Sequence, residues 1–211
     1  MYQLYLGRST AGFAPHVLLR EIGADFTLHF LDTAAGEHKR ANYLAINPFG
    51  KVPALVVDGH VMAESAAICL WLADHPDAAL APLPSAPERM PYLKWMLFLA
   101  STLHGALMPY FYPQRYTTGT EGHDAVKQAA VIAATGWFAQ LEQHLAAHGP
   151  YLLGEKLSAA DFYLFMLVRW GRHFDHPPRN MPAIAAFMQR LFGRASVQEA
   201  FAAEGITERF F

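Results

Sequence analysis

Hydrophobic and polar positions follow different patterns in the two halves of the chain. In the first half, short strand-like segments alternate with segments of helical periodicity. The strand-like segments are, in chain order, 2–7, 26–32 and a hairpin over 53–64. The helical segments are 14–23 and 65–75. Asp58-Gly59 is a dipeptide that favours the two-residue turn of a hairpin. This order of elements predicts a small α/β domain of the form βαβ-ββα.

After the first half, no strand pattern returns. Helical periodicity predicts helices over 88–112, 123–148, 158–173 and 182–194, and a short one over 196–204. Between the halves, "PDAALAPLPSAP" (76–87) has four prolines in twelve residues, which indicates a linker. We therefore predict an α/β domain over 1–77, a linker over 78–87 and an all-helical domain over 88–211.

Within the helical half, "LSAADF" (157–162) is a strong helix-start signal. Ser158 is the predicted N-cap, and Asp161 follows three residues later, as in a capping box. Each of the two side chains can satisfy a backbone amide that the helix itself leaves unpaired. The motif predicts a structural role.

Composition excludes several classes of function. Hydrophobic residues make up 53% of the chain and charged residues 16%, so a substantial core is available. The net charge is −2 without a basic run, which argues against a nucleic-acid partner. The eleven histidines show no metal-ligand spacing, so no metal site is expected.

The single cysteine excludes an intramolecular disulfide and suits a reducing compartment. No apolar run reaches the roughly 20 residues of a membrane span, and no signal peptide is recognised. We expect a cytoplasmic protein without a membrane partner.

The segment "NPFGKVPALVVDGHVMAES" (47–65) indicates a ligand. The Val52-Pro53 bond at a strand start favours a cis peptide, and a peptide-like ligand can pair with the backbone of Val52 by strand addition. Glu64 and Ser65 lie where the hairpin ends and a helix begins. Their side chains suit the ammonium and the carboxylate of an amino acid. Taken singly, such a proline is usually a turn element and such a serine a cap, but the combination favours a binding site.

These motifs, "NPFGKVPAL…ES" followed by "LSAADF", resemble those of the cytosolic glutathione transferases, and the resemblance covers the whole chain. It implies a thioredoxin-like N-terminal domain with a mixed four-stranded sheet, a helical C-terminal domain, a homodimer and a role in detoxification. It also implies glutathione as co-substrate and no further cofactor. Under this resemblance, Val52 pairs with the cysteinyl backbone of glutathione ahead of cis-Pro53. Glu64 and Ser65 hold the γ-glutamyl end, and Lys51 faces the glycyl carboxylate.

Activation of the glutathione thiol requires a hydrogen-bond donor near the first helix. A free thiol has a pKa near 8.5, whereas the thiolate is the nucleophile. The bacterial beta class, the nearest in sequence around "APHVLLREIG", carries a cysteine at the position of Ala11. Related classes use a serine directly after the first strand, where Ser9 falls. Ser9 is therefore the preferred thiolate-stabilising residue. Thr10, a backbone amide or no activating group are the alternatives.

The second substrate is expected against "LHGALMPYFYPQRY" (103–116). His104 matches a histidine that the beta class presents toward the thiol, whereas Gly105 stands where that class often has lysine. The predicted wall of the electrophile site shares an apolar or aromatic character and comprises Phe13, Met108, Tyr112, Tyr116 and Trp170. Such a wall suits small hydrophobic electrophiles, although the same residue types also suit a core.

The predicted function is a glutathione transferase that transfers glutathione to electrophilic alkyl or aryl groups. One alternative is a binding or regulatory protein of the same fold that lacks transferase activity. Another alternative is a glutathione-dependent peroxidase or isomerase.

Overall fold

The computed structural model describes residues 1–76 and 78–207 and divides into two compact units. The first unit consists of residues 1–83 together with the described residues from 192 onward, and the second of residues 84–191. Residue 77 and residues 208–211, which belong to the predicted domains, lie outside the described residues. The segment 78–87, predicted as a linker, contains neither a helix nor a strand.

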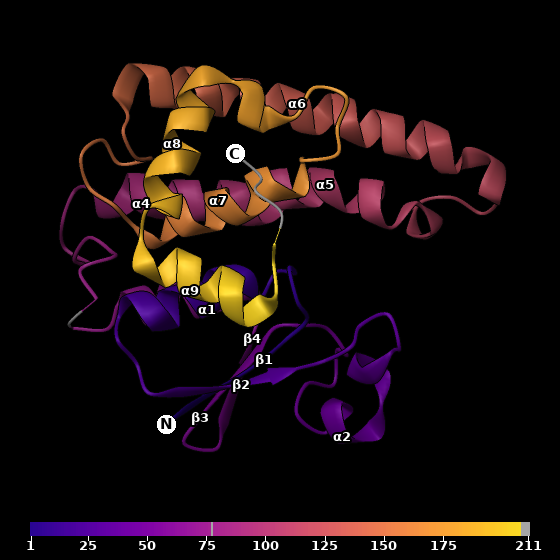
Figure 1. The fold of residues 1–211 in the computed structure, drawn as a ribbon, viewed down its shortest axis with the longest axis horizontal. Coiled ribbons are helices and arrows are strands. Elements are labelled where there is room, and N and C mark those ends of the chain that lie inside the picture. The colour runs from indigo at the N-terminus through magenta and orange to yellow at the C-terminus, as the bar shows by residue number, and fades with distance from the viewer. Residues whose placement is uncertain (77, 208–211) are drawn as a thin grey trace. The chain divides into compact units, whose positions relative to one another are not determined.

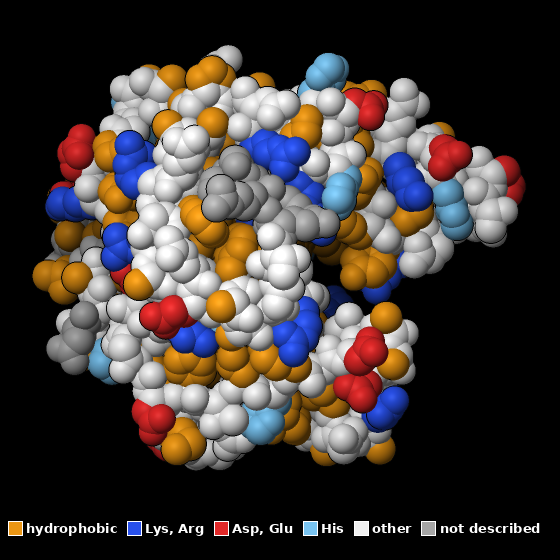
Figure 2. Space-filling view, in the orientation of Figure 1, with side chains coloured by type: hydrophobic (Ala, Val, Ile, Leu, Met, Phe, Trp, Pro, Cys, Tyr) orange, Lys and Arg blue, Asp and Glu red, His pale blue; other side chains and the backbone are white. Residues whose placement is uncertain are grey.

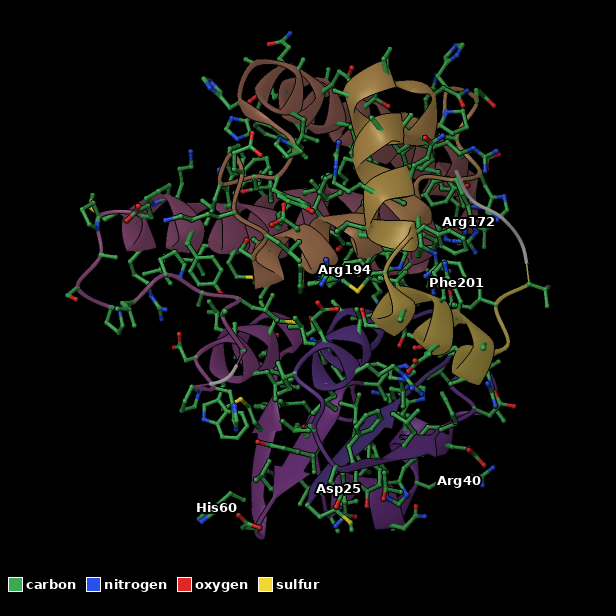
Figure 3. The ribbon with its side chains drawn as sticks, turned by 60° about the vertical axis from the view of Figure 1, so that its left-hand side comes forward. Asp25, Arg40, His60, Arg172, Arg194 and Phe201 are labelled. Carbon is green, nitrogen blue, oxygen red and sulfur yellow. The ribbon has the colours of Figure 1, made fainter. Side chains whose placement is uncertain are left out.

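The first unit contains a mixed four-stranded sheet (Figure 1). Its strands are β1 (Tyr2–Leu6), β2 (Phe26–Phe30), β3 (Ala54–Val57) and β4 (His60–Ala63), in the order β2-β1-β3-β4. The β1–β2 pair is parallel, and the other two pairs are antiparallel. Asp58 and Gly59 both have positive φ, as the tight turn requires, and His60 lies beside this turn (Figure 3). The predicted thioredoxin-like sheet is confirmed.

Four α-helices pack in the described part of the first unit. They are α1 (Phe13–Glu21), α2 (Ala41–Leu44), α3 (Ser65–Ala73) and α9 (Ala195–Glu204). Because seven consecutive residues of α1 are buried, this helix forms the centre of the unit, with α3 and α9 in contact with it. Phe13 of α1 packs edge-to-face on Phe201 of α9, with the ring centroids 5.5 Å apart. Although α9 follows the helical half in sequence, it therefore completes the core around α1.

The second unit is helical, as predicted. Its helices are α4 (Arg89–Leu97), α5 (His104–Phe111), α6 (His123–His148), α7 (Ala159–Trp170) and α8 (Pro182–Phe192). A π-helical segment, Phe98–Leu103, joins α4 to α5, so the single helix predicted over 88–112 contains a change of winding. Every residue of α7 is buried, which makes this helix the core of the unit.

The capping box predicted at the start of α7 is present. Asp161 accepts hydrogen bonds from the backbone N–H of Ser158 at 2.8 Å and from that of Leu152 at 2.8 Å. The carboxylate therefore joins the helix start to the preceding loop.

The surface carries mixed charge. Basic and acidic side chains are interspersed on the face drawn in Figure 2. None of the described helices combines the length and the apolar character that crossing a bilayer demands.

Candidate functional site

Three loops of the first unit meet at one edge of the sheet. Residue Ala54, the first of β3, pairs with Tyr5 near the end of β1 and with Ala63 at the end of β4. The chain segments that continue from these three positions therefore lie next to one another at this edge. They are the β1–α1 loop with Ser9, the loop that ends at Pro53, and the β4–α3 junction with Glu64 and Ser65. We call this region the sheet-edge site.

The β1–α1 loop brings two hydroxyl groups to the site. Ser9 is half-buried and has φ of +56°, in the left-handed region that few non-glycine residues adopt. Its backbone N–H donates to a carboxylate oxygen of Glu204 at 2.6 Å. The Thr10 hydroxyl donates to the carbonyl of Gly7 at 2.7 Å and accepts from the N–H of Gly12 at 3.4 Å. Thr10 thus closes the turn with its only hydroxyl hydrogen.

The start of α1 lies very close to β1. A Cβ atom on Gly12 would approach the Cβ of Leu6 to 2.5 Å, so only glycine fits at this position without movement. No acidic residue occurs in the first turn of α1. The positive end of the helix dipole is therefore not compensated within that turn, and it favours an anion beside the loop.

The loop before β3 contains the predicted cis peptide between Val52 and Pro53. The carbonyl of Lys51 accepts from the Tyr43 hydroxyl at 2.6 Å and from the Asn47 side-chain amide at 2.8 Å. Val52 precedes the strand, and in the part of the chain that the structure describes no hydrogen bond of its backbone is found. The loop is thus held on the N-terminal side of Val52 by Tyr43 and Asn47.

The β4–α3 junction carries the other two predicted residues. Glu64 is exposed, is the N-cap of α3 and has φ of +68°. Ser65 is buried and is the first residue of that helix. A carboxylate and a helix N-terminus are thus adjacent, an arrangement that suits an ammonium and a carboxylate of one ligand.

The second unit positions His104 at the end of the π-helical segment. Its Nδ1 lies 3.0 Å from the Tyr163 hydroxyl, and its ring packs edge-on against Trp170 with centroids 4.9 Å apart. Trp170 is only 7% exposed, so most of its ring contributes to the core of the second unit.

The residues predicted for the electrophile wall differ in exposure. Tyr112 and Tyr116 are 39% and 53% exposed, and Met108 is partly buried. Phe13 is 1% exposed and belongs to the core of the first unit.

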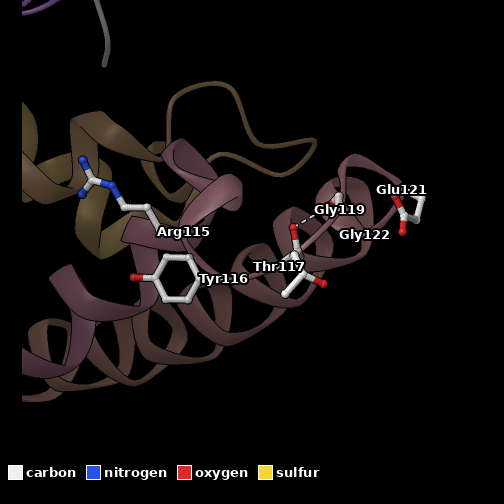
Figure 4. A pocket seen from close by; sticks show the side chains of 7 residues that line it. Arg115, Tyr116, Thr117, Gly119, Glu121 and Gly122 are labelled. Atoms are coloured by element: carbon white, nitrogen blue, oxygen red, sulfur yellow. Dashed lines mark hydrogen bonds between the residues drawn. The ribbon is translucent and has the colours of Figure 1, made fainter.

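An open hollow of about 530 Å³ lies in the loop that follows α5 (Figure 4). Its lining includes Arg115, Tyr116 and Glu121, and the Thr117 hydroxyl donates to the Gly119 carbonyl at 2.7 Å within it. Of the predicted site residues, Tyr116 lines this hollow.

Shifted pKa values mark structural groups. Burial raises the pKa of Cys69 well above its usual value, and burial raises the pKa of Asp161 to about 6. Neither group lies in one of the three loops of the sheet-edge site. Among the described residues, no cluster of three His, Cys, Asp or Glu side chains suits a metal ion.

Several positioning residues were not predicted from the sequence. Tyr43 and Asn47 hold the carbonyl of Lys51, Glu204 holds the amide of Ser9, and Tyr163 contacts His104. Asn47 begins the motif already singled out, so its polar side chain four residues before Lys51 was the available signal. The others are distant in sequence from the groups they hold.

Comparison with known proteins identifies the family. The glutathione S-transferase N-terminal domain model matches residues 1–74, and the glutathione S-transferase C-terminal domain model matches residues 98–195. "Glutathione S-transferase GstA" of Escherichia coli O157:H7 is 33% identical over 213 residues, which cover 97% of this chain and 99% of the relative. This chain belongs to the glutathione S-transferase family.

Solved structures agree with this assignment. A sphingomonad glutathione S-transferase complexed with glutathione is 33% identical with a TM-score of 0.85, covering 97% of this chain and 100% of that chain. A beta-class enzyme from Sphingomonas chungbukensis is 35% identical with a TM-score of 0.85 and the same coverage. The predicted superfamily and the prediction of a glutathione transferase are confirmed, and the comparisons do not support the alternative of a protein without this activity.

Proposed function

We propose that this transferase binds glutathione at the sheet-edge site, where a hydrogen bond from the Ser9 hydroxyl stabilises the thiolate and the thiol proton passes to solvent. The thiolate then attacks a small hydrophobic electrophile. The observation that carries the proposal is the pairing of Ala54 with both Tyr5 and Ala63, because it gathers the three loops at one edge.

Each part of glutathione has a proposed partner. The cysteinyl backbone pairs with Val52 ahead of cis-Pro53, by strand addition. The γ-glutamyl ammonium and carboxylate bind Glu64 and Ser65 at the start of α3, and the exposed Lys51 faces the glycyl carboxylate. This assignment matches opposite charges at both ends of the tripeptide. No resident cofactor is required in this scheme.

The choice of Ser9 over Thr10 rests on hydrogen bonds. The hydroxyl hydrogen of Thr10 is donated to Gly7, so it would have to leave that turn to reach a thiolate. The backbone N–H of Ser9 is donated to Glu204, and this contact fixes the turn that carries the Ser9 hydroxyl. Lowering the thiol pKa by two units requires about 2.7 kcal/mol. One hydrogen bond to a charged group supplies about 1.5–3 kcal/mol, and the dipole of α1 adds to it.

The electrophile is proposed to contact the second unit. Tyr112, Tyr116 and Met108 offer accessible apolar surface for a small hydrophobic electrophile. His104, whose Nδ1 lies 3.0 Å from the Tyr163 hydroxyl, is proposed as a further glutathione-binding residue. Trp170, whose ring packs edge-on against His104, is proposed to support this surface. Phe13 lies in the core of the first unit, against Phe201.

A homodimer is proposed from exposed apolar side chains. Val61 on the edge strand β4 and Trp71 on α3, both in the first unit, are 48% and 43% exposed. In the second unit, Leu97 at the end of α4 is 58% exposed. Large apolar side chains that are exposed to solvent favour association with a second copy of the chain. A cytoplasmic location is proposed because the only cysteine is a free, buried thiol.

The test is the ultraviolet thiolate absorbance of bound glutathione against pH, in the wild type, Ser9→Ala and Thr10→Val. A depressed thiol pKa in the wild type that returns toward the free value only in Ser9→Ala supports the proposal. A return only in Thr10→Val transfers the role to Thr10. No saturable glutathione binding in the wild type contradicts the proposed function.

A further inference from the structure

The side chain of Glu204 joins two segments that are far apart in sequence. It lies at the end of α9 and its side chain is fully buried. One carboxylate oxygen accepts the N–H of Ser9 at 2.6 Å, and the other lies 2.8 Å from Nδ1 of His16. All three residues belong to the first unit. A buried carboxylate is costly unless it is hydrogen-bonded, and here both oxygens have partners.

The hydrogen-bond partners of His16 indicate which ring nitrogen carries the hydrogen. Arg20 donates its Nε–H to Nε2 of His16 at 2.9 Å. A guanidinium group can only donate, so Nε2 carries a lone pair and the ring hydrogen is on Nδ1. His16 then donates that hydrogen to Glu204. Hydrogen bonds therefore connect Arg20, His16 and Glu204 to the amide of Ser9.

This chain of hydrogen bonds explains the unusual backbone of Ser9. Its φ of +56° is unfavourable for a residue with a Cβ and persists only where surrounding contacts enforce it. The Glu204 carboxylate contacts the N–H of this same residue. A second contact, from Arg8 Nη1 to the carbonyl of Ala203 at 3.0 Å, holds the preceding residue to the same helix end. The end of α9 thus fixes the turn that carries the Ser9 hydroxyl.

We propose that Glu204 is a positioning residue for thiol ionisation: by holding the Ser9 amide it sets the direction of the Ser9 hydroxyl. His16 and Arg20 hold the carboxylate in place. This inference rests on the proposed function of Ser9. Glu204 itself does not touch glutathione in this scheme.

The experiment compares Glu204→Ala with Glu21→Ala. Glu21 is a matched control because its carboxylate bonds to Arg194 and Ser196 at the other end of α9. Both variants weaken the attachment of α9 to α1, but only Glu204→Ala releases Ser9. The measurements are the free energy of unfolding, the pKa of the glutathione thiol in saturated enzyme, and kcat and KM.

Glu204→Ala is expected to raise the thiol pKa by about one unit and to lower kcat at neutral pH more than it changes KM. Glu21→Ala is expected to lose stability with the thiol pKa unchanged. In the double variant Ser9→Ala/Glu204→Ala, the thiol pKa should rise no further than in Ser9→Ala, because the two residues act through one hydroxyl. Where Glu204→Ala does not fold, Glu204→Asp replaces it, since the shorter side chain withdraws the carboxylate from Ser9 and keeps the charge.

Three results would overturn the inference. They are an unchanged thiol pKa in the folded Glu204 variant, an equal rise in Glu21→Ala, and additive effects in the double variant. A wild type with no depressed thiol pKa refutes the proposed function instead, and the two failures are thereby distinguished.

Discussion

The hydroxyl of Tyr43 donates a hydrogen bond of 2.6 Å to the carbonyl oxygen of Lys51. This contact ties α2 to the loop that ends at cis-Pro53. Burial raises the pKa of Tyr43, opposed by a hydrogen bond with Asn47, so the hydroxyl keeps its hydrogen and stays a donor at neutral pH. The contact sets the position of the backbone that is proposed to pair with glutathione.

Tyr43→Phe is expected to raise KM for glutathione with kcat nearly unchanged. The lost hydrogen bond is worth about 0.5–1.5 kcal/mol, which corresponds to roughly a two- to tenfold rise in KM. Steady-state kinetics with glutathione as the varied substrate measure this effect. Tyr151→Phe, which removes a hydroxyl of the second unit, is the control. Equal KM values in the two variants would refute a role for Tyr43 in glutathione binding.

The buried carboxyl group of Asp161 is expected to make a pH-dependent contribution to the free energy of unfolding. Its pKa of about 6 in the folded protein lies above the ordinary value of 3.8 because burial disfavours the charge. Between these two values, the folded protein binds the proton more tightly than the unfolded chain does. The stability from this group is therefore fully present below about pH 4 and is lost as pH rises through about 6.

Asp161→Asn is expected to be less stable than the wild type at every pH, by about 1–3 kcal/mol at pH 7. The reason is that an amide has one acceptor oxygen, whereas Leu152 and Ser158 donate to different oxygens of the carboxylate. The deficit should grow from pH 7 to pH 4, by up to about 3 kcal/mol. Urea unfolding at both pH values measures it. A stability deficit that shrinks toward pH 4 would contradict a raised pKa of Asp161 in the folded protein.

Two glycine substitutions are expected to have opposite effects. Gly12→Ala places a Cβ 2.5 Å from the Cβ of Leu6 and should destabilise the protein by about 1–3 kcal/mol. Gly136→Ala, inside α6, meets no atom within 4 Å and should stabilise it by about 0.5–1 kcal/mol. The free energies of unfolding of both variants, measured by denaturant titration, test the pair. An unchanged free energy of unfolding in Gly12→Ala would mean that α1 can move away from β1.

Cys69 is expected to be unreactive in the folded protein. The thiol is buried and burial raises its pKa, so little thiolate forms and reagents do not reach it. An aromatic disulfide reagent should label no thiol in native buffer and one thiol per chain in denaturant. A protein–glutathione mixed disulfide, detected by mass spectrometry of the folded protein, would contradict this expectation.

Trp71→Glu is expected to shift the proposed dimer toward monomer, because it places a charge in the proposed interface. The Trp71 side chain is 43% exposed in the single chain. Sedimentation velocity at micromolar concentration measures the change. Ile132→Glu, at an exposed position of α6 not assigned to the interface, is the control. A wild type that sediments as a monomer would refute the homodimer.

Local patterns in the sequence predicted most of the elements. The helix predicted over 123–148 coincides with α6, and the Asp58-Gly59 turn, the cis bond before Pro53 and the capping box at Ser158 are all present. Each of these features depends on residues that are close in sequence. The π-helical segment Phe98–Leu103 was not predicted, since a change from one hydrogen-bond register to another leaves no mark in apolar periodicity.

The residues that hold the candidate site in place could not be predicted from local sequence patterns. Glu204 lies 195 residues from Ser9, and Tyr163 lies 59 residues from His104. Nothing local to Glu204 distinguishes it from a carboxylate on an exposed helix face. The motifs indicated which residues face a ligand, but the partners that hold them follow from tertiary packing.

The attachment of α9 to α1 has a consequence for synthesis. The sheet and the helices α1, α2 and α3 are synthesised more than a hundred residues before α9. Until then, Phe13 lacks the ring of Phe201, and the Ser9 turn lacks Glu204. The nascent first unit therefore remains incomplete while the whole helical half is translated, and the turn that is proposed to handle the thiol is among the last parts of the protein to form.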